Sequence, residues 1–459
     1  MDINLTSGTL LSRFSRLAIA NIIANLMVPL AGIIDTAFLG HLAEIHHLGG
    51  VALATVIFNV VYWSFGFLRM GTTGLTAQAQ GRRDGPLGRS LGHRTDLYFD
   101  VYLVLVRNGL VALAIGFALL LLQEPIRVVG FGLLGGDADL RQAGEAFYYG
   151  RIWGSPAVLL NFVILGWMLG LGQGRRVIVL SVVANGSNII LDYWFIQRLG
   201  WASGGAGVAT SLSQYLMLGV GMIYLGRSLP WREWRTLGQD LWQPEALGIM
   251  VRLNRDILIR TFVLVMSFAL FTHWSATLGT TVLAANALML QVFTLTSYVV
   301  DGIAFATESF AGQFWGAQDY QQLRRLLEMG GGFSLVVGLG FALGFALWPR
   351  SLFGLMTDHE AVLVTVEQYG WWLVPVLGLG AIAFMLDGYF LGLTAGKWLR
   401  LSTVLATLVG FLPLALLGRW WHSPPLLWLA LVGLMLVRSL ILASRVPSTL
   451  TQHPEVTLG

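Results

Sequence analysis

Long apolar runs dominate the chain and recur at short intervals from residue 17 to residue 444. A helix needs roughly 20 mostly apolar residues to cross a bilayer. These runs are too long and too uniformly apolar for the alternating strands, of about ten residues each, that build transmembrane β-barrels. The pattern therefore predicts an all-α polytopic membrane protein with twelve transmembrane helices, at residues 17–39, 49–79, 98–122, 147–173, 177–197, 204–226, 255–278, 283–313, 329–349, 368–394, 399–418 and 424–444.

The composition agrees with this class. Of the 459 residues, 56% are apolar and 11% are charged, whereas a soluble domain carries about 25% charged residues. The short connections leave no room for a large extramembrane enzyme domain. Since the chain has no cysteine, disulfide scaffolds and thiol–zinc sites are excluded. The first helix lacks a convincing signal-peptide cleavage site, and we expect it to be retained.

Positive residues are divided unevenly between the two sets of loops. With the N-terminus inside, the inner loops hold 18 Arg and Lys residues and the outer loops hold five. Because positive loops favour the cytoplasmic side, both termini are predicted to be cytoplasmic in a cell (inner or plasma) membrane. Topology control accounts for the net charge of +4, so nucleic acid is not an expected partner.

The two halves of the chain resemble each other. GFLRMGTTGLTAQAQGRRD (66–84) matches DGIAFATESFAGQFWGAQD (301–319) at an offset of 235, and GWMLGLGQG (166–174) matches GYFLGLTAG (388–396) at an offset of 222. An offset of six helices preserves orientation, which indicates parallel repeats about an axis along the membrane normal. We predict an amino-terminal six-helix lobe at 1–226, a cytoplasmic linker at 227–252 and a carboxy-terminal six-helix lobe at 253–459.

Acids inside the first-half spans are the strongest functional candidates, because a charge at the bilayer centre costs roughly 2.5–3.5 kcal/mol. Asp35 follows a stretch containing Pro29, and Asn185, Asn188 and Asp192 share one helix face. A carboxylate beside amide oxygens can hold a proton or a small cation. For the residues of span five the alternative is polar bonding between helices, and for Asp35 it is simple hydration near the outer water layer. Thr210 is a weaker candidate, expected to bond its own i−4 carbonyl.

The second half has acids of its own. Tyr298, Asp301 and Glu308 follow helical spacing in span eight together with Thr294, and Asp387 lies in span ten. They are candidates for a carboxy-lobe cavity, and structural ion pairs are an equal alternative. Arg69 and Arg260 are candidate partners for these acids.

The sequence gives little support for metal binding, ATP hydrolysis or catalysis. His41, His46 and His47 sit in a short outer loop, where solvated histidines are favoured over a surface metal site. The chain has no G-x-x-x-x-G-K-[ST] loop, so ATP is not the expected energy source. It has no H-E-x-x-H motif or DDxxD-like acidic cluster either, so we do not expect an enzyme.

Five segments carry a family resemblance: PLAGIIDTAFLGHL (29–42), LGGVALATVIFNVVYWSFGFLRMGTTGLTAQAQG (48–81), ILGWMLGLGQGRRVIVLSVVANGSNIILD (164–192), LNRDILIRT (253–261) and YVVDGIAFATESFAGQFWGAQD (298–319). In their order and spacing they resemble the multidrug and toxic compound extrusion (MATE) family, and its DinF-like branch in particular. The resemblance extends over essentially the full chain.

This resemblance implies two pseudo-symmetric lobes around a V-shaped cavity, and export of cationic or amphipathic organic compounds in exchange for H⁺ or Na⁺. It implies that Asp35, Asn188 and Asp192 hold the proton or Na⁺, with Thr210 nearby. The charged position in span ten of several Na⁺-coupled relatives falls near Asp387. Where some relatives carry an acid in span seven, this chain has His273 and no carboxylate.

We therefore expect a monomeric secondary exporter that works by alternating access and binds small organic substrates and membrane lipid. It would need no cofactor beyond the coupling ion. A flippase for lipid-linked precursors is the nearest alternative and would need a strongly cationic cavity. An intramembrane transferase is a more distant alternative and would need a clustered metal or nucleophile motif.

Overall fold

The computed structural model describes residues 7–42, 44–86, 95–135, 137–228 and 240–451. Eleven helices in these ranges are long and apolar enough to cross a membrane, and the pair α7–α8, bent by 54°, adds a twelfth span. The described residues contain helices and no strands. The predicted fold class is thus confirmed.

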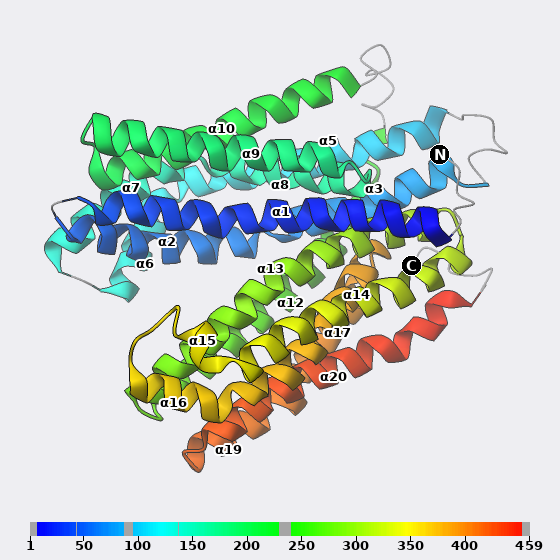
Figure 1. The fold of residues 1–459 in the computed structure, drawn as a ribbon. Helices are drawn as coiled ribbons and strands as arrows, with labels where there is room; N and C mark the ends of the chain where they lie inside the picture. Colours follow the sequence, from blue (N-terminus) through cyan, green and yellow to red (C-terminus); the bar gives the residue numbers. More distant parts are fainter. Residues whose placement is uncertain (1–6, 43, 87–94, 136, 229–239, 452–459) are drawn as a thin grey trace. The chain divides into compact units, whose positions relative to one another are not determined.

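The helices extend past the predicted spans because their polar ends continue the helical backbone beyond the apolar run. Their bounds are α1 (Ser7–Gly40), α2 (His46–Ser64), α3 (Phe67–Asp84), α5 (Thr95–Leu121), α6 (Gln123–Leu134), α7 (Ala138–Ile152), α8 (Ser155–Gly170), α9 (Gly174–Asp192), η1 (Tyr193–Arg198), α10 (Ala202–Ser228), α12 (Pro244–Ala276), α13 (Thr280–Gly316), α14 (Tyr320–Leu347), α15 (Pro349–Phe353), α16 (Glu360–Tyr369), η3 (Gly370–Trp372), α17 (Leu373–Gly392), α18 (Gly396–Leu405), η4 (Ala406–Phe411), α19 (Leu412–Trp420) and α20 (Pro424–Leu450) (Figure 1).

The chain forms two compact units whose boundaries differ from a simple division at the linker. Unit 1 contains residues 1–22, 77–92 and 251–459, and unit 2 contains residues 23–76 and 93–250. Two short segments of the first half therefore pack with the second half. The predicted lobe boundaries stay a prediction, and residues 229–239 of the predicted linker lie outside the described residues.

Unit 2 is held together by close helix packing around α7 and α10. A side chain at Gly207 of α10 would run into the carbonyl oxygen of Phe147 of α7, so glycine permits the two backbones to approach. The buried indole of Trp167 in α8 donates to the carbonyl of Val101 in α5 over 2.9 Å. Helix α9 packs against α10 and α8 of this group.

Unit 1 is built around α17, which packs against α13, α14 and α20, and α13 also packs against α14 (Figure 1). Its apolar core includes Phe271, Trp428 and Met435. The buried Trp428 indole donates to the side-chain oxygen of Asn286 over 2.9 Å, so this polar group has a partner inside the core.

Residues 77–86 pack with unit 1 through a symmetric pair of glycines. A side chain at Gly81 would meet the carbonyl of Gln313, and one at Gly316 would meet the carbonyl of Gln78. These are corresponding positions at the offset of 235. The repeated motif thus brings the ends of α3 and α13 into backbone contact.

The internal repeat extends to the turns and the ion pairs. Gly172 and Thr394, which correspond at the offset of 222, both have positive φ, at 69° and 54°. Arg127 of α6 donates to Glu145 over 2.7 Å, and Arg350 of α15 donates to Glu367 over 2.5 Å. In each half an ion pair thereby connects a short helix to the helix that follows it, α6 to α7 and α15 to α16.

Candidate functional site

Two acids that are far apart in the sequence meet in unit 2. Asp35 lies in α1, six residues after Pro29 within the same helix. Asp192 is the last α-helical residue of α9, and the backbone then widens into the π-helix η1. Such π-helical segments are frequent at functional sites. The Gln197 side chain of η1 donates to the carbonyl of Phe38 in α1 over 3.3 Å, which holds the two elements together.

The carboxyl groups of Asp35 and Asp192 are within hydrogen-bonding contact of each other. Asp192 is fully buried and Asp35 is half-buried. Among the described residues, neither oxygen of Asp192 has a hydrogen-bond donor, nor has the Oδ1 oxygen of Asp35. Two ionised carboxylates repel at such a contact, so the pair is satisfied when it holds a proton or a small cation.

Arg151 of α7 completes the charge balance of this site. Its guanidinium interacts electrostatically with Asp35 and lies over the rings of Phe58, at 4.7 Å from the centroid, and Phe147, at 5.5 Å. Two carboxylates and one guanidinium carry a net charge of −1, and one added monovalent cation makes the group neutral. The charges therefore suit a single H⁺ or Na⁺.

The three other predicted residues of this site have different surroundings. Asn188 is 7% exposed, and its amide nitrogen has no acceptor among the described residues. It lies one helical turn before Asp192, on the same face. Asn185 instead donates to the carbonyl of Ser181 over 2.8 Å. Thr210 donates to the carbonyl of Ala206 over 2.9 Å, so its predicted i−4 bond is confirmed.

Asp387 in unit 1 is buried between two arginines. Its Oδ2 oxygen accepts hydrogen bonds from Arg260 of α12 and from Arg438 of α20. All three residues are at most 6% exposed. Arg260 was expected to pair with an acid, and this pair is observed. A carboxylate already compensated by two guanidiniums has little capacity left to bind a further cation.

Asp301 and Tyr298 lie near this triad, whereas Glu308 is further along α13. Asp301 interacts electrostatically with Arg438 and with Tyr298. Glu308 is fully buried and lies seven residues beyond Asp301, about 10 Å along the helix axis. Its backbone carbonyl abuts Gly392 of α17. The contacts therefore associate Asp301, Tyr298 and Asp387 with one another.

Sequence reasoning did not assign roles to Arg151 and Arg438. Both arginines fall within predicted spans, and this rarity was the available indication, because intramembrane charges pair with opposite charges. Their partners could not be inferred, because Arg438 and Asp387 are separated by 51 residues and Arg151 lies in a different helix from Asp35.

Comparison with known proteins identifies the family. The MatE family model matches the chain twice, over residues 20–194 and 257–417, in agreement with the internal repeat. DNA damage-inducible protein F of Escherichia coli is 34% identical over 93% of this chain and 90% of its own length. A probable multidrug resistance protein NorM of Acinetobacter baylyi is 25% identical over 77% of this chain and 75% of its own.

The fold is also similar to that of solved structures. A MOP superfamily transporter from Pyrococcus furiosus superimposes with a TM-score of 0.81 at 19% identity, over 96% of this chain and 97% of its own. The duplicated helices, the full-length match and the shared fold agree, and the chain belongs to the MatE family of multidrug and toxic compound extrusion transporters.

Proposed function

We propose that this protein is a secondary active exporter that exchanges organic compounds for H⁺ or Na⁺ at the Asp35–Asp192 pair. The observation that carries the proposal is the contact between two carboxyl groups, in which both oxygens of Asp192 and the Oδ1 oxygen of Asp35 lack a donor among the described residues. Such a pair changes its charge when one cation binds or leaves. Membership of the MatE family supports an efflux role, since the family includes a probable multidrug resistance protein.

Cation binding is coupled to transport through the helices that carry the pair. A proton or Na⁺ between the two carboxyls draws α1 towards α9, and its departure leaves two like charges that repel. Pro29 lacks a backbone donor within α1, so the helix can bend at this point. The ion drives the exchange only to the extent that it binds one conformation more tightly than the other.

The Asp387 triad is assigned a structural role in this scheme. Its carboxylate bridges α12 and α20 through Arg260 and Arg438. The flippase alternative loses support for a related reason. The buried Arg260 and Arg438 and the half-buried Arg151 each interact with a carboxylate, so they do not form an uncompensated cationic surface for a pyrophosphate.

The proposed location, oligomeric state and substrates are those expected from the sequence. We place the protein in the inner or plasma membrane, with both termini cytoplasmic, as the loop charges favour. It acts as a monomer on cationic or amphipathic organic molecules, with membrane lipid around it.

The experiment is dye export from proteoliposomes under an imposed pH gradient, an imposed Na⁺ gradient, or neither. Wild-type protein moves dye uphill with one gradient and not without it, and Asp192→Asn loses this transport. Asp139→Asn removes an exposed carboxylate of the same unit and is the matched control that retains it. Gradient-independent export, or full activity of Asp192→Asn, would contradict the proposal.

A further inference from the structure

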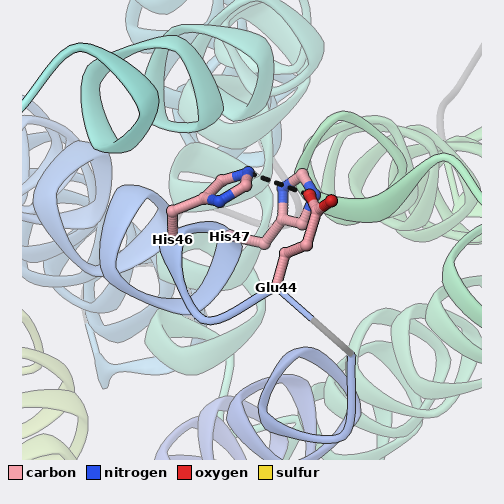
Figure 2. A group of neighbouring side chains, drawn as sticks. All are labelled: Glu44, His46 and His47. Carbon is pink, nitrogen blue, oxygen red and sulfur yellow. Dashed lines mark ion pairs between the residues drawn. The ribbon is translucent and has the colours of Figure 1, made fainter.

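Two histidines and a glutamate converge where α1 connects to α2. Glu44 precedes α2, and His46 and His47 are the first two residues of that helix. Their side chains point toward one another in Figure 2, and one ligand atom of each lies within 4.8 Å of the others. They are 64%, 33% and 21% exposed, respectively, so an ion can reach them from solvent.

The distances match a metal coordination shell. The Oε2 oxygen of Glu44 is 3.2 Å from Nε2 of His46 and 3.5 Å from Nε2 of His47. Ligands bound tetrahedrally to zinc at 2.0–2.1 Å are separated from one another by about 3.3 Å. The two imidazole rings have centroids 4.4 Å apart, and one nitrogen of each lies within 4.8 Å of the other.

A buried hydroxyl orients one of the rings. Nδ1 of His47 lies 3.2 Å from Oγ of Ser203 in α10, and Ser203 is 1% exposed. When Nδ1 donates to this hydroxyl, the lone pair of His47 is on Nε2, the atom that faces Glu44. Ligating histidines in metal sites almost always have such a partner on the other ring nitrogen.

We propose that Glu44, His46 and His47 bind one divalent transition-metal ion, with Zn²⁺ as the representative. Two imidazoles and one carboxylate suit Zn²⁺, Ni²⁺ or Cu²⁺, whereas Mg²⁺ and Ca²⁺ prefer shells made of oxygen. Three protein ligands leave one position for water.

The site has a consequence for transport, which, unlike metal binding itself, rests on the proposed function. Asp35 lies nine residues before Glu44 along the chain. Glu44 lies four residues after the end of α1, so a metal on Glu44 and the two histidines fixes the connection that follows α1 to the first turn of α2, and through His47 and Ser203 to α10. The bound ion therefore restrains the movement of α1 and slows export.

Binding is tested with Zn²⁺ and the full-length protein in detergent, after removal of any affinity tag, by calorimetric titration in the presence of excess Mg²⁺ and Ca²⁺. We expect one Zn²⁺ per chain, and at least tenfold weaker binding in His46→Ala, His47→Ala and Glu44→Gln. His41→Ala is the control that retains binding, because the His41 ring bonds the carbonyl of Ala37 at 2.7 Å and lies outside the cluster. Failure of the wild type to bind Zn²⁺, or equal binding by the histidine variants, would overturn the site.

The transport consequence has its own test. Zn²⁺ should slow dye export by the wild type and by His41→Ala, and leave the rate of the His46→Ala/His47→Ala double variant unchanged. Tight binding without any change of rate would overturn the restraint on α1. If the wild type exports no dye under any gradient, the proposed function fails while the binding result still decides the metal site.

Discussion

Replacing Asp387 by asparagine should destabilise unit 1 more than replacing either of its arginine partners. Asp387→Asn removes the carboxylate that accepts from both Arg260 and Arg438, and Arg438 is fully buried. Breaking a buried ion pair on one side costs about 3–5 kcal/mol. In a unit of about 250 residues, each kcal/mol lowers Tm by roughly 2–4 °C, so the expected fall is roughly 6–20 °C.

The assay is thermal unfolding of purified variants in one detergent. Arg438→Met leaves the Asp387–Arg260 pair intact and should lower Tm less than Asp387→Asn. The double variant Asp387→Asn/Arg438→Met leaves one unpaired guanidinium instead of two, so its Tm should exceed that of Asp387→Asn alone. Glu328→Gln, which breaks an exposed pair with Arg324, should cost at most about 1 kcal/mol. Additive losses in the double variant would refute a carboxylate shared by two arginines.

Two further outcomes follow from packing and charge. Gly81→Ala presses a methyl group against the rigid carbonyl of Gln313 and should cost about 1–3 kcal/mol, whereas Gly340→Ala, with no atom within 4 Å, should be neutral or stabilising in the same melting assay. A hydrogen bond from the Tyr149 hydroxyl is the main cause that lowers the pKa of Glu124 in the folded protein. The ionised Glu124 side chain therefore stabilises the fold at pH values above its unfolded-state pKa, and this stabilisation is lost as the pH falls through its folded-state pKa. The Tm difference between wild type and Glu124→Gln should therefore be measurable at pH 7 and should shrink as the pH falls below about 4; a difference that stays constant in acid would contradict this cause.

The helices could be predicted because their determinants are local. Apolar runs of membrane length specify each span, and the repeated glycine motifs indicated the duplication. The two compact units could not be derived in the same way. The assignment of residues 77–86 to unit 1 depends on backbone contacts such as Gly81 with Gln313, which involve residues more than 200 positions apart.

The residues of the candidate site could likewise be predicted only where the signal is local in the sequence. The rarity of intramembrane acids selected Asp35 and Asp192, and helical spacing placed Asn188 beside Asp192. The roles of Arg151 and Arg438 depend on which helices are neighbours in three dimensions, and no local pattern contains that information. Helical spacing also grouped Asn185 with the site, although its amide bonds the carbonyl of Ser181 in its own helix.

The central claim is that the Asp35–Asp192 pair exchanges a cation for substrate, and substrate-driven ion movement tests it most directly. In proteoliposomes that hold a pH-sensitive dye, with ²²Na⁺ in a parallel set, an imposed gradient of organic cation should drive H⁺ or Na⁺ in the opposite direction. Asp35→Asn and Asp192→Asn should each abolish this counter-movement, whereas Asp387→Asn, assayed below its Tm, should retain it. Undiminished counter-movement of the ion in Asp35→Asn/Asp192→Asn would contradict the account.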